Sequence, residues 1–309
     1  MKPFRFGVSA REAESAASWT EQARRAEQLG YSSFLLADHL VSIPAPFAAL
    51  AVAAAATSRI RVGPFVLNND FRHPVIVARE AATLDMLSGG RLELGLGAGH
   101  MRSEYTEAGF PYDAAGVRVE RLQESVRIIK ALLAGEQVSV QGAHYRLSGH
   151  RGWPPPTQPP RPPVLVGGHG RRLLGLAARE ADIVGLTGFT LRAGGTRPDP
   201  SGFYQVGLED RLSLVESEAG PRLPDLELNA LVQRVVVTED REREVRTLTA
   251  EFQVPAEELL RTPFVLFGTH DQLVQQLNGF RLKYGLSYFV VFERYMEAFA
   301  PVVARLAGS

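Results

Sequence analysis

The side chains best suited to chemistry in this sequence directly follow short apolar runs. Asp38 and His39 come immediately after the apolar run Ser33–Ala37. A histidine can transfer a proton near neutral pH or hydrogen-bond to the polar edge of a ring. The alternative is a histidine that only caps a loop, and position alone does not separate the two. If the run is a barrel strand, His39 lies on the catalytic face and is our first candidate for a catalytic residue.

Residues 60–100 carry a second set of such side chains. Two apolar runs, Ile60–Leu67 and Leu92–Leu96, flank a helical pattern over Pro74–Leu87. Two buried strands joined by one amphipathic helix form a parallel βαβ unit. The polar residues Asn68–His73 and a series of alternating glycines follow the two strands. Because α/β folds place their sites just past the carboxyl ends of strands, this segment indicates both a fold and the edge of a site.

The hexapeptide GLGAGH, residues 95–100, resembles a dinucleotide-binding turn only superficially. The Rossmann spacing needs a glycine where this chain has His100, and no acidic partner is obvious about twenty residues later. We therefore exclude a Rossmann site. The small residues Gly97, Ala98 and Gly99 would still let a flat ring or a ribityl chain approach the backbone. Tight packing between strand and helix explains the same residues, so both interpretations stay open.

A third candidate site is the run Gly167-Gly168-His169-Gly170, which precedes a helical pattern over Arg171–Glu180. Exposed backbone N–H groups and the helix dipole favour a phosphate at such a position. Arg171 and Arg172 add positive charge. A flexible turn is the alternative, but the position after a predicted strand favours phosphate binding.

Composition excludes several classes of function. The chain has 34 Lys and Arg against 34 Asp and Glu, so no global charge favours nucleic acid or an anionic membrane. It has no cysteine, which excludes disulfides, thiolate metal sites and a cysteine nucleophile. No HExxH, GxSxG or metal-ligand spacing occurs, so we expect no metal. The first residues lack the apolar core of a signal peptide, and the apolar run Phe47–Ala56 is too short to cross a membrane, so we expect a cytoplasmic protein.

Apolar runs and helical patterns alternate along almost the whole chain. This pattern favours an α/β fold, a (β/α)8 TIM barrel in one domain over residues 1–309, above an open doubly wound sheet. The eight predicted strands are Phe4–Ser9, Ser33–Ala37, Ile60–Leu67, Leu92–Leu96, Val164–Val166, Asp182–Leu186, Leu226–Val237 and Tyr288–Phe292.

Two segments interrupt the alternation, after strands four and six. Residues 135–163 contain a hairpin pattern over Gln137–Leu147 and the proline-rich stretch WPPPTQPPRPP, and we predict an ordered insertion. Polyproline segments also serve as linkers or recognition ligands, but here a predicted strand follows the proline-rich stretch directly. Residues 187–205 are rich in Gly, Thr and Pro and long for a connection, which indicates a lid or binding loop.

With these residues in view, the chain resembles the bacterial luciferase-like superfamily of flavin and deazaflavin oxidoreductases. Three blocks carry the resemblance in the right order and spacing. They are ARRAEQLGYSSFLLADHL (Ala23–Leu40), VGPFVLNNDFRHPVIVAREAATLDMLSGGRLELGLGAG (Val62–Gly99) and PPVLVGGHGRRLLGLAAREADIVGL (Pro162–Leu186).

The resemblance implies a TIM barrel with an isoalloxazine-type cofactor at its carboxyl-end mouth. It implies a non-proline cis peptide between Phe65 and Val66 beneath the ring, and a place for His39 near the reactive ring edge. It also implies two groups of cofactor-binding residues. Asn68, Gly97, Ala98, Gly99 and His100 would flank the cofactor, and Gly167, Gly168, His169 and Gly170 would hold its phosphate.

The chain departs from the two best-known branches of that superfamily. Relatives closest to bacterial luciferase have a phosphate-binding arginine where this chain has Ala98, which counts against FMN. Deazaflavin-dependent glucose-6-phosphate dehydrogenases have a catalytic glutamate where this chain has His100, and a tryptophan where it has Ile43. The sugar-phosphate reaction is therefore in doubt.

We therefore expect a coenzyme F420-dependent oxidoreductase acting on a small organic molecule, with His39 and His100 as catalytic residues. An FMN-dependent monooxygenase is the alternative enzyme, and a non-catalytic flavin-binding barrel is the alternative of another class. Resemblance further implies a homodimer through helices near strands two and three, where the alanine-rich Phe47–Ala56 lies. Burial of that helix within the monomer would explain its composition equally well.

Overall fold

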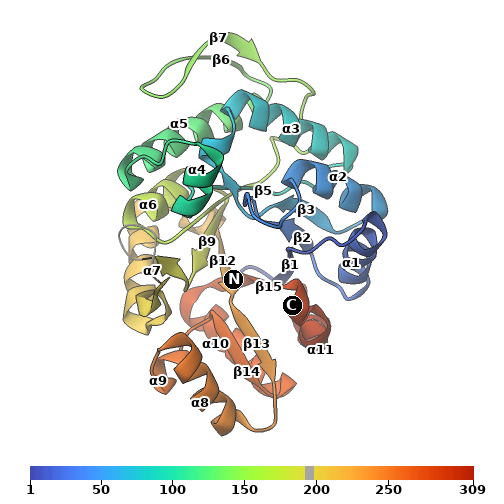
Figure 1. The fold of residues 1–309 in the computed structure, drawn as a ribbon, viewed down its shortest axis with the longest axis vertical. Coiled ribbons are helices and arrows are strands. Elements are labelled where there is room, and N and C mark those ends of the chain that lie inside the picture. The colour runs from blue at the N-terminus through green and yellow to red at the C-terminus, as the bar shows by residue number, and fades with distance from the viewer. Residues whose placement is uncertain (192–197) are drawn as a thin grey trace.

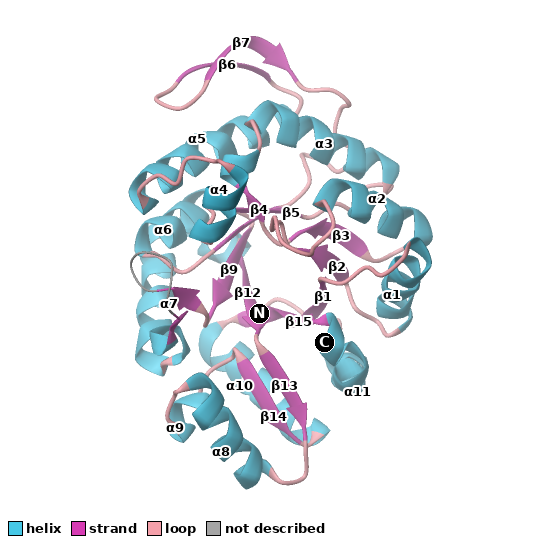
Figure 2. Ribbon diagram, in the orientation of Figure 1, coloured by secondary structure: helices cyan, strands magenta, loops and turns pink. Residues whose placement is uncertain are grey.

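The computed structural model describes residues 1–191 and 198–309, and its centre is a parallel β-barrel surrounded by helices (Figures 1 and 2). Nine strands form the sheet, in the order β3-β2-β1-β15-β12-β9-β8-β5-β4. They are β1 (Arg5–Ala10), β2 (Ser33–Leu36), β3 (Arg61–Pro64), β4 (Leu67–Asn68), β5 (Leu94–Gly97), β8 (Val164–Gly167), β9 (Ile183–Thr187), β12 (Glu227–Val232) and β15 (Leu286–Phe292).

Strands β3 and β4 are two halves of one barrel position. They lie at opposite ends of the sheet order, and β4 pairs with β5 while β3 pairs with β2. A parallel bridge between Val62 and Leu92 joins β3 to the residues just before β5 and closes the ring. The predicted third strand, Ile60–Leu67, is thus present in two pieces, and the predicted eight-position TIM barrel is confirmed.

Most of the helices cover the outside of the barrel. They are α1 (Ala16–Gln28), α2 (Pro46–Ala56), α3 (Pro74–Leu87), α4 (Arg102–Ala108), α5 (Ala115–Leu133), α6 (Arg171–Glu180), α7 (Gln205–Ala219), α8 (Arg241–Phe252), α9 (Ala256–Leu259), α10 (His270–Tyr284) and α11 (Met296–Leu306). Local sequence defines several of their ends. Ser15 with Ser18, and Thr269 with Gln272, form capping boxes that satisfy the first N–H groups of α1 and α10.

The pleat of each strand divides the apolar side chains between two cores. In β15, Phe289 and Val291 face the helices, whereas Tyr288 and Val290 face the barrel interior with Leu35 and its neighbours. The outer core includes a set of aromatic rings, in which Phe289 lies 6.4 Å from Phe6 between ring centroids. Strands buried on both faces explain why each reads as a continuous apolar run.

The predicted seventh strand, Leu226–Val237, is wrong in its extent. Only β12 belongs to the barrel, and the chain leaves the ring at Gln233, whose backbone N–H donates to the Phe264 carbonyl at 2.7 Å. The remainder, β13 (Arg234–Val237), pairs in parallel with β14 (Val265–Gly268) in a separate two-stranded sheet. The sequence did not predict β14 as a strand. Helices α8 and α9 lie with this sheet at one edge of the molecule (Figure 1).

The two predicted insertions have different outcomes. A hairpin of β6 (Gln137–Gln141) and β7 (Arg146–Arg151) follows α5 and lies at the outer edge of the helical ring, as the pattern over residues 135–163 predicts (Figure 1). The predicted lid, residues 187–205, contains β10 (Thr190–Leu191) paired with β11 (Pro198–Asp199). Residues 192–197 of this segment lie outside the described residues, so its role as a lid stays a prediction.

Replacing Phe289 with alanine tests the outer core. Phe289 is fully buried against Phe4 and Phe6, so Phe289→Ala should lower the free energy of unfolding by about 3–5 kcal/mol. Urea denaturation measures this change. Leu282→Ala is the control, because Leu282 is 77% exposed and its truncation should cost less than about 0.5 kcal/mol. Equal effects of the two substitutions would contradict the assignment of this core.

Candidate functional site

The predicted site residues come together because every barrel strand points the same way. His39 follows β2, Asn68 ends β4, Gly97 ends β5 and Gly167 ends β8. The carboxyl ends of parallel barrel strands open onto one mouth, where βα loops build active sites. The structure therefore places the candidates of three separate sequence blocks on one face of the barrel.

The imidazole of His39 is held by a buried carboxylate. Its Nδ1 lies 2.9 Å from Oε1 of Glu104, and the same oxygen accepts the backbone N–H of Leu40 at 2.9 Å. Glu104 belongs to α4 and is only 4% exposed. Because an ionised carboxylate can only accept hydrogen bonds, Nδ1 carries the proton and Nε2 of a neutral ring is an acceptor. Glu104 was not predicted from the sequence, since no motif marks a glutamate five residues past the glycine turn.

His100 lies beside His39 in the mouth. The two ring centroids are 5.5 Å apart and the rings are nearly perpendicular, at 83°. Desolvation by the surrounding protein, followed by the nearby His39 and Arg118, lowers the pKa of His100 to about 4. His100 as a whole residue is exposed to solvent at the mouth. His100 is therefore a neutral hydrogen-bonding group at physiological pH rather than a cation.

Asp38, although adjacent to His39, is committed to holding the strand ends together. Its carboxylate accepts two hydrogen bonds from Arg72, at 2.5 and 3.1 Å, and one from the backbone N–H of Asn68 at 3.0 Å. The side-chain oxygen of Asn68 also has hydrogen-bond partners within the protein. Its Oδ1 accepts from the Tyr105 hydroxyl at 2.9 Å and from the Asp70 backbone N–H at 3.1 Å. The Asn68 amide Nδ2 has no hydrogen bond to any residue that the structure describes, so it is left for a ligand.

Glycines surround Val66 in the barrel throat. The Phe65–Val66 bond is cis, as the family resemblance implies, and both residues pack against the inner core. A Cβ added to Gly97 would lie 2.6 Å from Cγ2 of Val66, and one on Gly167 would lie 3.3 Å from its Cγ1. Packing on Val66 therefore requires glycine at position 97, and at position 167 a side chain would fit only tightly. Cofactor contact through the same backbone stays a prediction.

The turn after β5 is fixed by Arg118 of α5. Its guanidinium Nε donates to the Ala98 carbonyl at 3.2 Å, and a terminal nitrogen donates to the Asp113 carbonyl at 2.5 Å. It also lies 4.2 Å from the centroid of the Tyr112 ring. A positive charge is thus present at this turn even though position 98 is alanine. The sequence analysis did not single out Arg118 as a site residue.

The start of α6 has the features of an anion site. The N-cap residue is Gly170, and among the described residues no side chain caps the first N–H groups of this helix. A Cβ built on Gly170 would meet nothing within 4 Å, so the space beside the N-cap residue is open. Arg171 and Arg172 are exposed in the first turn. Desolvation, with the nearby Arg211 as the next cause, lowers the pKa of His169 to about 4, so His169 is neutral here.

Comparison with known proteins gives the family. The family model described as luciferase-like monooxygenase matches residues 1–198. The chain belongs to the luciferase-like monooxygenase family. It is 32% identical over 250 residues, 78% of this chain and 70% of the relative, to a protein from Nakamurella multipartita named F420-dependent glucose-6-phosphate dehydrogenase.

Other relatives match over a shorter segment or by fold alone. A Beutenbergia cavernae protein, also named F420-dependent glucose-6-phosphate dehydrogenase, is 35% identical over 165 residues, 51% of this chain. The match spans about half of that curated relative, 48% of its length. Among solved structures, the F420-dependent tetrahydromethanopterin reductase of Methanopyrus kandleri superposes with a TM-score of 0.77 at 21% identity. That alignment covers 98% of this chain and 99% of the reductase, and it shows a shared fold.

The buried hydrogen bond between His39 and Glu104 can be tested by substitution. Glu104→Gln should reduce the population of the Nδ1-protonated tautomer of His39, because a neutral amide can present either a donor or an acceptor to the ring. The measurement is ¹⁵N NMR of the imidazole nitrogens. Glu107→Gln is the control, since Glu107 is an exposed residue of the same helix. A tautomer ratio that does not change in Glu104→Gln would contradict the assigned role.

The protonation state of His100 is a second test. Its lowered pKa predicts a titration midpoint below ~6.5, the usual value for histidine, so the ring stays neutral as pH falls from 7 to 6. The midpoint is measured by NMR titration of the ring carbon resonance of His100. That resonance is assigned because it is absent from the spectrum of His100→Gln. A midpoint at or above the usual value would contradict the proposed environment.

Proposed function

We propose that this protein is a coenzyme F420-dependent oxidoreductase that transfers a hydride between the deazaflavin and a small organic substrate. The observation that carries the proposal is the joint position of two features on one barrel mouth. One is the buried pair of Glu104 and His39, and the other is the uncapped, glycine-rich start of α6. Relatives at 32–35% identity whose names specify F420 support the same cofactor.

The residues at the mouth fit a cofactor with a phosphate and a flat ring. The open space before Gly170 and the free N–H groups of α6 suit the phosphate, with Arg171 in the first turn. Phe65 and Val66 would form the floor beneath the ring, and the backbone of residues 97–99 would lie at its edge. When bound, the deazaflavin would supply or accept the hydride.

The side chains of this protein would manage the proton and the orientation. With Nδ1 of His39 committed to Glu104, Nε2 is positioned to take the proton that a substrate hydroxyl releases, and the buried carboxylate would stabilise the imidazolium. His100, neutral beside it, would hydrogen-bond without adding positive charge. The walls of the barrel would hold the reactants in place and exclude water.

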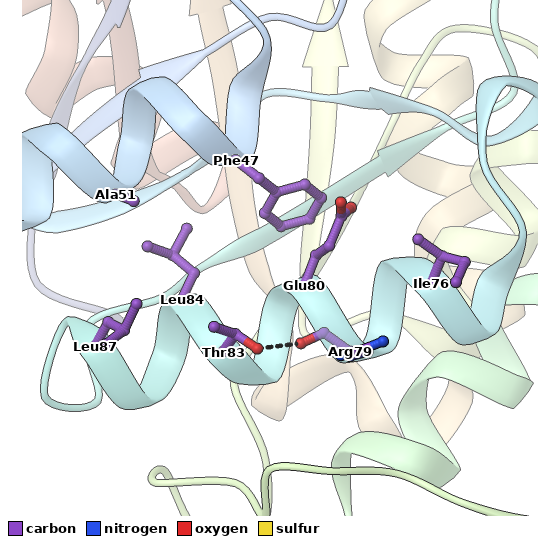
Figure 3. Close-up of a pocket in the computed structure, with 8 residues that line it drawn as sticks. All are labelled: Phe47, Ala51, Ile76, Arg79, Glu80, Thr83, Leu84 and Leu87. Atoms are coloured by element: carbon purple, nitrogen blue, oxygen red, sulfur yellow. Dashed lines mark hydrogen bonds between the residues drawn. The ribbon is translucent and has the colours of Figure 1, made fainter.

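We also propose that the protein forms a homodimer through α2 and α3. A groove of about 280 Å³ lies between these helices, lined by apolar side chains such as Phe47, Ile76 and Leu87 (Figure 3). Ile76 is 45% exposed and Leu87 is 64% exposed, which leaves an unpartnered apolar face. Glu80 faces Phe47 across the groove, and burial raises the pKa of its carboxyl group (Figure 3).

The cofactor proposal is tested by titrating F420 into the purified protein and following its fluorescence. We expect binding at micromolar protein and at least tenfold weaker binding by Gly170→Asp. Aspartate at this position would cap α6 and add a negative charge where the phosphate belongs. Gly279→Asp adds the same charge to an exposed site in α10 and should bind like the wild type. Failure of the wild type to bind F420, or preference for FMN, would overturn the proposal.

The dimer proposal is tested by light scattering coupled to size exclusion. Ile76→Asp places a charge in the apolar groove and should convert the dimer to a monomer. Leu282→Asp is the matched control on α10, where Leu282 is 77% exposed, and should leave the mass unchanged. A monomeric wild type would contradict the proposed interface.

A further inference from the structure

One hydrogen-bond donor at the barrel mouth has no partner within the described part of the chain. It is the amide nitrogen Nδ2 of Asn68, the last residue of β4. Asn68 is only 6% exposed, yet its printed neighbours all bond to its Oδ1 or its backbone, and none accepts from Nδ2. The nitrogen itself is not completely shielded from solvent. Since buried polar groups are nearly always paired, an open donor on a nearly buried side chain points to a ligand.

The orientation of this amide is fixed by a backbone N–H group. The N–H of Asp70 donates to Oδ1 of Asn68 at 3.1 Å. Because a backbone N–H can only donate, the side-chain atom that faces it must be the oxygen, and Nδ2 points the other way. A role for Asn68 as the cap of the short 3-10 helix Asn69–Phe71 explains this bond at Oδ1. It does not explain why Nδ2 is left open.

The hydroxyl group of Tyr105 reinforces the same orientation from α4. Its oxygen lies 2.9 Å from Oδ1 of Asn68 and 3.0 Å from Oδ2 of Asp70. Tyr105 is fully buried, and desolvation, followed by the charge of Asp70, raises the pKa of its hydroxyl group. The hydroxyl group therefore keeps its proton, which it shares between these two acceptors. Turning the amide over would bring Nδ2 against the backbone N–H of Asp70, where two donors would face each other.

Two further contacts hold the groups around the amide. Arg121 of α5 donates to Oδ1 of Asp70 at 2.8 Å, which leaves Oδ2 of that carboxylate for Tyr105. On the other side, a Cβ added to Gly99 would overlap the Tyr105 hydroxyl oxygen and lie 2.8 Å from Nδ2 of Asn68. Gly99, at a φ of 71°, therefore packs directly against the amide. Nδ2 thus lies beside the turn after β5, at the barrel mouth.

Helix α4 positions two side chains of the mouth through consecutive residues. Glu104 accepts from Nδ1 of His39, and Tyr105 donates to Oδ1 of Asn68. The first bond leaves Nε2 of His39 as an acceptor, and the second leaves Nδ2 of Asn68 as a donor. A helix of seven residues thus presents one acceptor and one donor to the same mouth.

We propose that Tyr105 and Asp70 are positioning residues, which orient the amide of Asn68 so that Nδ2 donates a hydrogen bond to an acceptor atom on the ring of the bound cofactor. A ring carbonyl oxygen or an unprotonated ring nitrogen is the kind of acceptor that an amide N–H₂ group takes. The cofactor as the occupant rests on the proposed F420-dependent function. The orientation of the amide does not, because it is set by contacts within the protein.

Hydrogen exchange in the protein without cofactor tests the orientation. Among the described residues, Oδ1 of Asn68 is the only acceptor for the backbone N–H of Asp70. Exchange of this N–H, followed by NMR of ¹⁵N-labelled protein, should therefore be at least tenfold faster in Asn68→Ala than in the wild type. Asn68→Asp keeps an acceptor oxygen at this position and should retain the protection. Equal exchange rates in the wild type and Asn68→Ala would overturn the proposed orientation.

Fluorescence titration of F420 tests the contact with the cofactor. Asn68→Asp replaces the donor with an ionised oxygen that repels a ring acceptor, and it should weaken binding at least tenfold. Asn278→Asp adds the same charge to an exposed position of α10 and should bind like the wild type. Tyr105→Phe removes one hydroxyl group and should weaken binding about fivefold. Tyr31→Phe removes a buried hydroxyl group that donates to the Met296 carbonyl, and it should have no effect.

A double-mutant cycle separates positioning from a general structural role. Because Tyr105 is proposed to act through Asn68, Tyr105→Phe should change F420 affinity less than about twofold in an Asn68→Ala background. A merely structural contribution would give the same loss in both backgrounds and would overturn the proposal. Circular dichroism establishes that each variant is folded. Asp70→Asn, which weakens the hold on the Tyr105 hydroxyl group, gives a second variant for the same cycle.

The two measurements separate this inference from the proposed function. F420 binding by the wild type that Asn68→Asp and Asn68→Ala leave unchanged would overturn this inference alone. Absence of F420 binding by the wild type would overturn the proposed function and, with it, the cofactor ring as the occupant. Hydrogen exchange of the Asp70 N–H would in that case still decide the orientation of the amide.

Discussion

All strands of the barrel run in one direction, and the site depends on this constraint. Parallel pairing brings the ends of β2, β4, β5 and β8 to one mouth, although the residues that follow them are separated by up to about two fifths of the chain. Closure requires the throat to be filled, and Val66 fills it against glycines of β5 and β8. Because these glycines have no side chains, they permit this packing and also leave the backbone uncovered at the mouth. The stability of the barrel and the candidate site therefore depend on the same glycines.

Within the mouth, each of these charged groups has its own hydrogen-bond partner. The carboxylate of Asp38 is used by Arg72 and orders the strand ends, whereas Glu104 is used by His39 and fixes its ring. Arg118 contacts backbone carbonyls of the turn after β5. A neutral His100 stands between these groups. This arrangement leaves Nε2 of His39, the neutral ring of His100, the Asn68 amide nitrogen and the open start of α6 for a ligand, and these groups are the chemical basis of the proposed hydride-transfer enzyme.

The periodicity of the sequence was sufficient to predict the barrel, because strands buried on both faces appear as apolar runs between amphipathic helices. It could not predict where Leu226–Val237 leaves the ring, since the apolar pattern continues through Gln233 into a second sheet. The place of His39, His100 and the Gly167–Gly170 turn at the barrel mouth could be predicted, because each follows a strand, and their roles stay predictions. Glu104 could not, because its partner lies 65 positions away in the sequence and only the fold brings the two together.

A crystal structure with oxidised F420 bound would test the account most directly. The account predicts the cofactor phosphate at the first N–H groups of α6 and the ring over Phe65 and Val66, with its edge within hydrogen-bonding distance of Nε2 of His39. A cofactor bound elsewhere on the barrel, or a ring whose edge faces away from His39, would contradict it.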